Sequence, residues 1–262
     1  MKYFDTHAHY DFGQFRGDRS RLLGGLPEVG IVGVVNIGID VETSQRSIEL
    51  AHEYPYIWAT VGFHPHNADQ VTEAGIESIK RLASDERVVA IGETGFDYFR
   101  NRATRDNQRK WFARQLELSL ELQLPVVVHS REAAEDTLRM LRHYDIKRAV
   151  VHCFNDTVDY ALQYEEMGLM IGLGGTVTYP RTQALAEAIK ALRPETILLE
   201  TDCPYLSPHP NRSARNDSTN IPAICRRIAE IRGEAPEEIA AKTTANAQRF
   251  YGTTKHEAFV VS

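Results

Sequence analysis

Histidines and carboxylates at a few points along the chain are the residues best suited to chemistry. Each follows or ends a short apolar run, and together they are His7, His9, His64, Glu93, His129, His152 and Asp202. Imidazole binds zinc, manganese, iron or nickel, and a carboxylate can bridge two ions. If four of these histidines and both carboxylates converge in the fold, the sequence indicates a site for divalent metal with enough ligands for two ions.

The sharpest local motif is Asp5-Thr6-His7-Ala8-His9. Residues i and i+2 of an extended segment point to the same side, so His7 and His9 can bind one ion together. An isolated His-x-His pair is as often a surface or hydrogen-bonded feature. The motif therefore indicates metal binding only together with the other histidines and carboxylates that follow predicted strands.

Short β-branched runs alternate with longer segments of helical period, which is typical of β/α units around a parallel sheet. The runs cover 2–5, 31–37, 57–62, 88–92, 125–129, 149–152, 169–172 and 196–200. The amphipathic segments include 43–53, 105–122, 133–143, 183–192, 222–231 and 236–251. Eight repeats in 262 residues predict a single-domain (β/α)8 TIM barrel, for which about 250 residues is typical, with a doubly wound sheet as the alternative. We expect the domain to cover 1–252 and a C-terminal tail without pattern to follow at 253–262.

The carboxyl ends of the strands in such a barrel open onto one face, so residues far apart in the sequence meet there. One shared site is therefore expected. Two divalent ions bridged by a carboxylate activate water and clamp the attacking and leaving oxygens of an ester, amide or phosphodiester. The loops around the ions set the substrate.

Cationic and aromatic residues near the expected strand ends suggest a substrate that carries phosphate. Arginines crowd the segment 100–114, and His64 and Arg131 also follow strand ends, although a solvated helix face explains the helical arginines equally well. Aromatic residues that could stack on unpaired bases, or simply pack at the rim, are Tyr98, Phe99, Tyr179 and Tyr205. The long polar segment 207–220 is typical of a functional loop.

Composition excludes some classes of protein and favours a compartment. With Lys+Arg 30, Asp+Glu 36 and a net charge of −6, bulk charge does not favour a protein that coats nucleic acid. Three widely spaced cysteines without a CxxC motif fit free thiols, so we expect a cytoplasmic protein. Neither a signal peptide nor a membrane span is indicated, and no heptad suggests an obligate partner, so a monomer is expected.

The motifs together resemble those of the TatD-like metal-dependent deoxyribonucleases, in order and over most of the chain. They are Asp5-Thr6-His7-Ala8-His9, Gly62-Phe63-His64-Pro65, Gly92-Glu93-Thr94-Gly95-Phe96-Asp97, Val128-His129-Ser130-Arg131, Val151-His152-Cys153-Phe154 and Leu199-Glu200-Thr201-Asp202-Cys203-Pro204-Tyr205. The resemblance implies a TIM barrel with two divalent ions (magnesium, manganese or zinc), one on His7, His9 and Asp202 and one on His129 and His152, with Glu93 as the bridge. It also implies hydrolysis of DNA, often from a 3′ end.

Within that resemblance we assign Asp202 and Glu93 to catalysis and His64 and Arg131 to substrate phosphate. The segment 211–222 departs from the compact loop that relatives more often have, which bears on substrate fit and not on metal binding. DNA, single-stranded or at its 3′ ends, is the expected partner.

Three other functions compete with a nuclease. An amidohydrolase acting on a small ester or amide is the main alternative, although a lysine at the position of Glu93 would have favoured it. Phosphoesterases of the polymerase-and-histidinol-phosphatase type usually end on Asp-x-His, whereas this chain ends on Thr201-Asp202-Cys203. A barrel that binds without turnover is disfavoured by the intact set of metal ligands.

Overall fold

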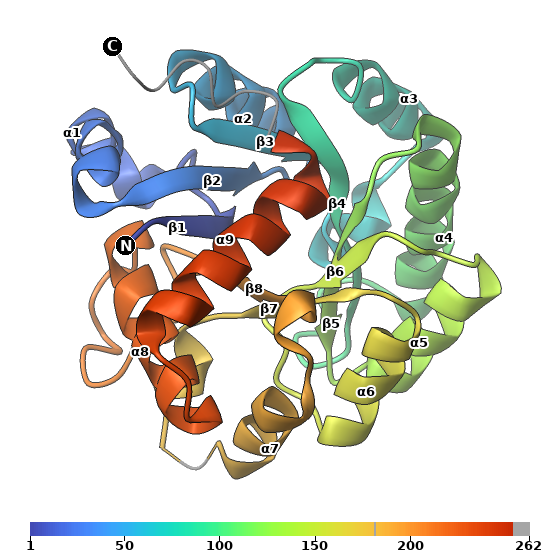
Figure 1. Cartoon of the computed structure of the whole chain (residues 1–262). Coiled ribbons are helices and arrows are strands. Elements are labelled where there is room, and N and C mark those ends of the chain that lie inside the picture. Colours follow the sequence, from blue (N-terminus) through green and yellow to red (C-terminus); the bar gives the residue numbers. More distant parts are fainter. Residues whose placement is uncertain (181, 254–262) are drawn as a thin grey trace.

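The computed structural model describes residues 1–180 and 182–253, and it contains an eight-stranded parallel sheet whose strands follow one another in chain order. The strands are β1 Tyr3–Ala8, β2 Ile31–Ile37, β3 Ile57–Val61, β4 Val88–Asp97, β5 Val126–Arg131, β6 Ala149–Val151, β7 Met170–Leu173 and β8 Ile197–Leu199. Helices surround them (Figure 1). The predicted single-domain (β/α)8 barrel is confirmed.

The six amphipathic segments named from the sequence are helices whose ends agree to within two residues, and the helices at 19–25, 73–82 and 158–166 were not named there. The helices are α1 Arg19–Gly25, α2 Val41–Glu53, α3 Glu73–Leu82, α4 Arg105–Leu122, α5 Ala134–His143, α6 Val158–Glu166, α7 Gln183–Ala191, α8 Ile221–Arg232 and α9 Pro236–Tyr251. Within the described part of the chain, no helix is both long enough and apolar enough to cross a membrane.

The barrel closes where β1 meets the segment after β8. His9 N donates to Cys203 O at 2.9 Å, and Asp202 N donates to His7 O at 2.9 Å. Behind this seam the buried Asp5 carboxylate accepts hydrogen bonds from Thr201 N at 3.0 Å and Thr201 Oγ1 at 2.7 Å. The seam therefore fixes the backbone of His7, His9 and Asp202 relative to one another.

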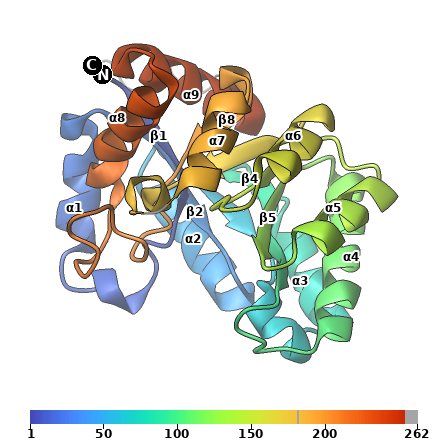
Figure 2. The same ribbon diagram turned by 90° about the horizontal axis from the view of Figure 1, so that it is seen from below.

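The hydrophobic core forms two layers, one between strands and helices and one inside the barrel. Inside the barrel, Phe4 of β1 stacks on Trp58 of β3 with ring centroids 5.7 Å apart, and α9 adds Phe250 and Tyr251 to the same layer. Helix α9 lies across the end of the barrel where the strands begin (Figures 1 and 2). The opposite end, where the strands have their carboxyl ends, remains available for a site.

Strand β4 extends further than the sequence predicted, through Asp97 instead of ending at Gly92. Gly92 and Gly95 adopt φ values of +131° and +139°, which residues with a Cβ rarely reach. A Cβ on Gly95 would also meet the carbonyl oxygen of His129 on β5. The two glycines thus continue a strand where they were expected to end one.

The proposed C-terminal tail falls mostly beyond the described residues. Thr253, its first residue, is buried, and 254–262 lie outside the described residues.

Candidate metal centre

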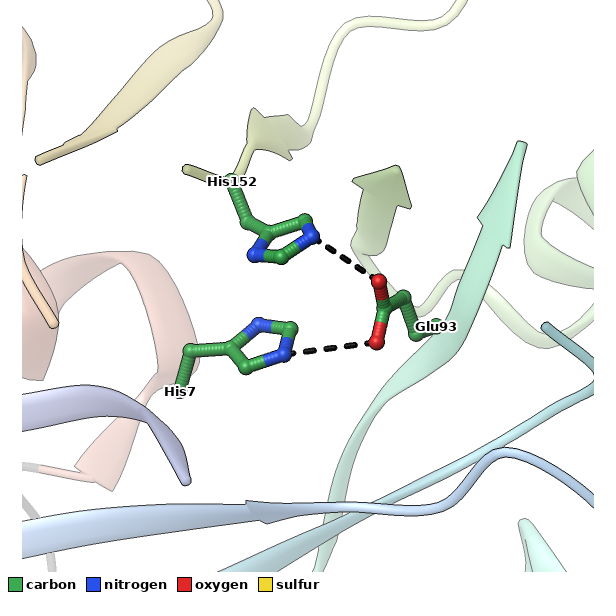
Figure 3. A group of neighbouring side chains, drawn as sticks. All are labelled: His7, Glu93 and His152. Carbon is green, nitrogen blue, oxygen red and sulfur yellow. Dashed lines mark ion pairs between the residues drawn. The ribbon is translucent and has the colours of Figure 1, made fainter. Parts of the chain in front are cut away.

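Glu93 of β4 lies at the centre of the site, with both carboxylate oxygens facing imidazoles. Its Oε2 is 3.3 Å from His7 Nε2 and its Oε1 is 2.8 Å from His152 Nε2 (Figure 3). The rings of His7 and His152 stack in parallel, with centroids 3.9 Å apart. Oε1 also lies 2.7 Å from His129 Nδ1. A single carboxylate therefore joins residues from β1, β5 and the end of β6.

His9 and Asp202 form a second group with His7 on the β1 side of Glu93. Asp202 Oδ1 lies 3.4 Å from His9 Nε2 and 3.6 Å from His7 Nε2. The two histidine Nε2 atoms are 3.3 Å apart. The Asp202 side chain is 17% exposed, against 3% for Glu93, so Asp202 is the more accessible of the two carboxylates.

His64 lies inside the cluster and not at its rim. Its Nε2 is 3.4 Å from Glu93 Oε1, and His64, Glu93 and His129 form a third group whose donor atoms all lie within 4.8 Å of one another. Arg131, by contrast, is exposed at the end of β5, where its guanidinium lies 4.1 Å from the centroid of the Phe99 ring. The structure thus brings together seven of the eight residues that the sequence singled out and leaves Arg131 outside.

Two carboxylates that received no role from the sequence lie behind the imidazoles. Asp97 Oδ2 is 3.2 Å from His129 Nε2, and Glu200 Oε1 is 3.5 Å from His152 Nδ1. Carboxylates in this position orient a metal-binding imidazole and raise its basicity. Both residues belong to the motifs quoted above, so the signal was present, but the sequence does not show which nitrogen each carboxylate faces.

The ionisable groups of the cluster perturb one another strongly. Burial raises the pKa of Glu93, but the nearby imidazoles, that of His152 first, outweigh burial and hold that pKa well below its ordinary value. Burial lowers the pKa of His64 to about 4. Burial also lowers the pKa of His152, yet the Glu93 carboxylate, together with that of Glu200, outweighs burial, so that pKa lies well above its ordinary value. The cluster therefore places side by side groups whose pKa values are shifted in opposite directions.

The donor atoms fit a divalent cation. His9 Nδ1 lies 3.2 Å from the carbonyl oxygen of Ile37, which can only accept, so a neutral His9 carries its proton there. Its Nε2 then presents a lone pair to the Asp202 and Glu93 carboxylates, at 3.4 and 3.9 Å. Lone pairs that face carboxylates repel unless positive charge lies between them, and imidazole with carboxylate is a ligand set for zinc or manganese.

Comparison with known proteins agrees with this geometry. The family model described as TatD related DNase matches residues 4–252. A protein of Citrobacter rodentium named 3′-5′ ssDNA/RNA exonuclease TatD is 38% identical over 259 residues, which is 96% of this chain and 98% of that protein. The metal-dependent hydrolase YabD of Bacillus subtilis is 35% identical over 95% of this chain and 98% of its own length.

A solved structure shares the whole fold. The crystal structure of YJJV, a TatD homologue from Escherichia coli, superimposes with a TM-score of 0.91 and 29% identity, over 95% of this chain and 98% of that one. Family model, relatives and structure all span nearly the entire barrel. The chain belongs to the family of TatD-related DNases.

Proposed function

We propose that this chain is a metal-dependent nuclease that hydrolyses phosphodiester bonds of single-stranded DNA, most often from a 3′ end. The observation that carries the proposal is the position of Glu93, whose two oxygens face separate imidazoles. The names of the relatives, which include 3′-5′ ssDNA/RNA exonucleases at 36% and 38% identity, support this substrate.

The ligand set would hold two divalent ions of magnesium, manganese or zinc. His7, His9 and Asp202 would hold one ion, His129 and His152 the other, and Glu93 would bridge them. Bound ions would act as Lewis acids and would lower the pKa of water, so that hydroxide is available for attack at neutral pH.

The remaining chemistry falls to side chains near the cluster. Asp202 is the general base of the proposal, because its carboxylate is the more exposed of the two. Its Oδ1 faces His7 and His9, which leaves Oδ2 to take the proton of an attacking water. His64 and Arg131 would contact substrate phosphate, His64 at the cluster and Arg131 at the rim.

We also propose that the protein acts as a cytoplasmic monomer whose domain covers 1–252. Its cysteines, Cys153, Cys203 and Cys225, are free thiols, as a reducing compartment favours. Sedimentation of the purified protein tests the monomer directly.

The deciding experiment measures metal content and hydrolysis of a single-stranded oligonucleotide, with and without chelator, for wild type and Glu93→Ala. Activity that chelator abolishes and that Glu93→Ala lacks is the expected result. Two bound ions with turnover of a small ester or amide, and none of DNA, would overturn the nuclease in favour of an amidohydrolase.

A further inference from the structure

Two exposed aromatic rings stand out on the molecular surface. Among the large hydrophobic residues that the structure describes, five are exposed, and the only aromatic ones among them are Phe99 at 49% and Tyr205 at 50%. Neither residue belongs to the hydrophobic core clusters, so core packing does not explain them. Exposed aromatic rings are typical of binding surfaces.

Both rings lie at the carboxyl ends of strands, on opposite sides of the cluster. Phe99 follows β4 and Tyr205 follows β8, and strands four places apart in an eight-stranded barrel face each other across its axis. Glu93 and its imidazoles occupy the space between these strand ends. A chain molecule bound across the cluster would therefore meet one ring on each side.

Phe99 is fixed close to the His129 side of the cluster. Asp97, which contacts His129, also accepts a hydrogen bond from Arg100 N at 2.7 Å and so holds the turn that carries Phe99. The guanidinium of Arg131 lies over the Phe99 ring, 4.1 Å from its centroid, and that of Arg100 lies over it at 5.3 Å. These cations hold the ring in place and add positive charge for phosphate, while about half of the Phe99 residue stays exposed to a base.

Tyr205 is fixed close to the His9 side. Its backbone N donates to Asp202 O at 3.0 Å, and its carbonyl accepts from Asn216 Nδ2 at 2.7 Å. Its ring meets Phe12 edge-on, with centroids 6.3 Å apart, and Phe12 in turn stacks on His9 at 4.6 Å. A continuous aromatic path thus leads from a metal-binding imidazole to the exposed ring.

We propose that Phe99 and Tyr205 are base-stacking platforms that hold unpaired nucleobases on either side of the phosphodiester at the cluster. The inference rests on the proposed nuclease function and deepens it, because it explains a preference for single strands, whose bases are free to stack. Double-stranded DNA hides the faces of its bases, so the two rings would have nothing to bind there.

The test measures binding separately from hydrolysis. The probe is a 5′-fluorescein-labelled oligothymidylate with phosphorothioate linkages, which slow its hydrolysis, and fluorescence anisotropy in Mn²⁺ gives its Kd. Phe99→Ala and Tyr205→Ala are each expected to raise Kd roughly 5- to 150-fold, the range that loss of one stacked base implies. Phe99→Tyr and Tyr205→Phe, which keep the rings, are expected to bind within about 2-fold of wild type.

Matched controls separate stacking from general damage. Leu120→Ala removes an equally exposed apolar side chain, 49%, from α4, and it should leave Kd unchanged. An abasic oligomer of the same length should bind wild type and both alanine variants equally.

Several results would overturn the proposal. One is that Phe99→Ala or Tyr205→Ala binds the probe with the same Kd as wild type. Another is that the alanine variants lose as much affinity for the abasic oligomer as for the probe. A third is that wild type does not bind the probe. If wild type binds the probe through both rings but never hydrolyses an unmodified strand, the nuclease function fails while the platforms stand.

Discussion

Asp97 Oδ2 lies 3.2 Å from Nε2 of His129, on the side of the ring that faces away from Glu93. The same carboxylate oxygen is 2.8 Å from His66 Nε2. Asp97 therefore fixes the orientation of an imidazole that we propose to be a metal ligand.

Asp97→Asn should lower the affinity for Mn²⁺ by about 10- to 100-fold, the usual effect of removing such a carboxylate. The amide fills the same space but carries no charge, so the substitution makes the His129 imidazole less basic without changing how the ring packs. Isothermal titration with Mn²⁺ measures the change. His66→Ala leaves Asp97 in contact with His129 and serves as the control; equal affinity in Asp97→Asn and wild type would contradict the assignment.

Glu93→Ala should fold normally and lose its stabilisation by metal. The carboxylate lies at the mouth of the barrel and not in the layers of side chains that fill it. Wild type at 100 times its metal Kd should gain about 2.7 kcal/mol for each ion bound, and the variant should gain little because its shared ligand is gone. Thermal unfolding with Mn²⁺ and with chelator measures both. A variant stabilised as much as wild type would show that Glu93 does not bind the ions.

The order of the elements was predictable from the sequence because β-branched runs and helical periods alternate without interruption. The end of β4 was not, because Gly92 and Gly95 normally signal a turn and here continue an extended strand with positive φ. The residues of the centre could be predicted from their places after apolar runs. The contact of His64 with Glu93 and the backing roles of Asp97 and Glu200 could not, since they depend on side-chain directions across the barrel.

Asp5→Ala should destabilise the protein by about 3 kcal/mol or more, because it leaves several buried donors without an acceptor. The carboxylate accepts from both the backbone and the hydroxyl of Thr201 and, at 2.6 Å, from Ser218 Oγ. Urea unfolding of the metal-free protein measures the loss.

The control is Asp18→Ala, which removes a partly exposed ion pair with Arg215 and should cost much less stability than Asp5→Ala, because solvent screens the pair. Equal costs for the two variants would show that the Asp5 network does not secure the barrel seam.

The charge of Arg131 and the stacking on Phe99 should affect the salt dependence of oligonucleotide binding differently. Arg131 contributes a positive charge beside Phe99, and if that charge contacts one phosphate, Arg131→Gln should reduce the slope of log Kd against log salt by about 0.7. Phe99→Ala removes no charge and should weaken binding at every salt concentration with the slope unchanged. Arg139→Gln, whose residue pairs with Glu135 and Asp136 on α5, is the matched charge control and should alter neither quantity. An unchanged slope in Arg131→Gln would leave Arg131 as a support for the Phe99 ring and remove it from phosphate binding.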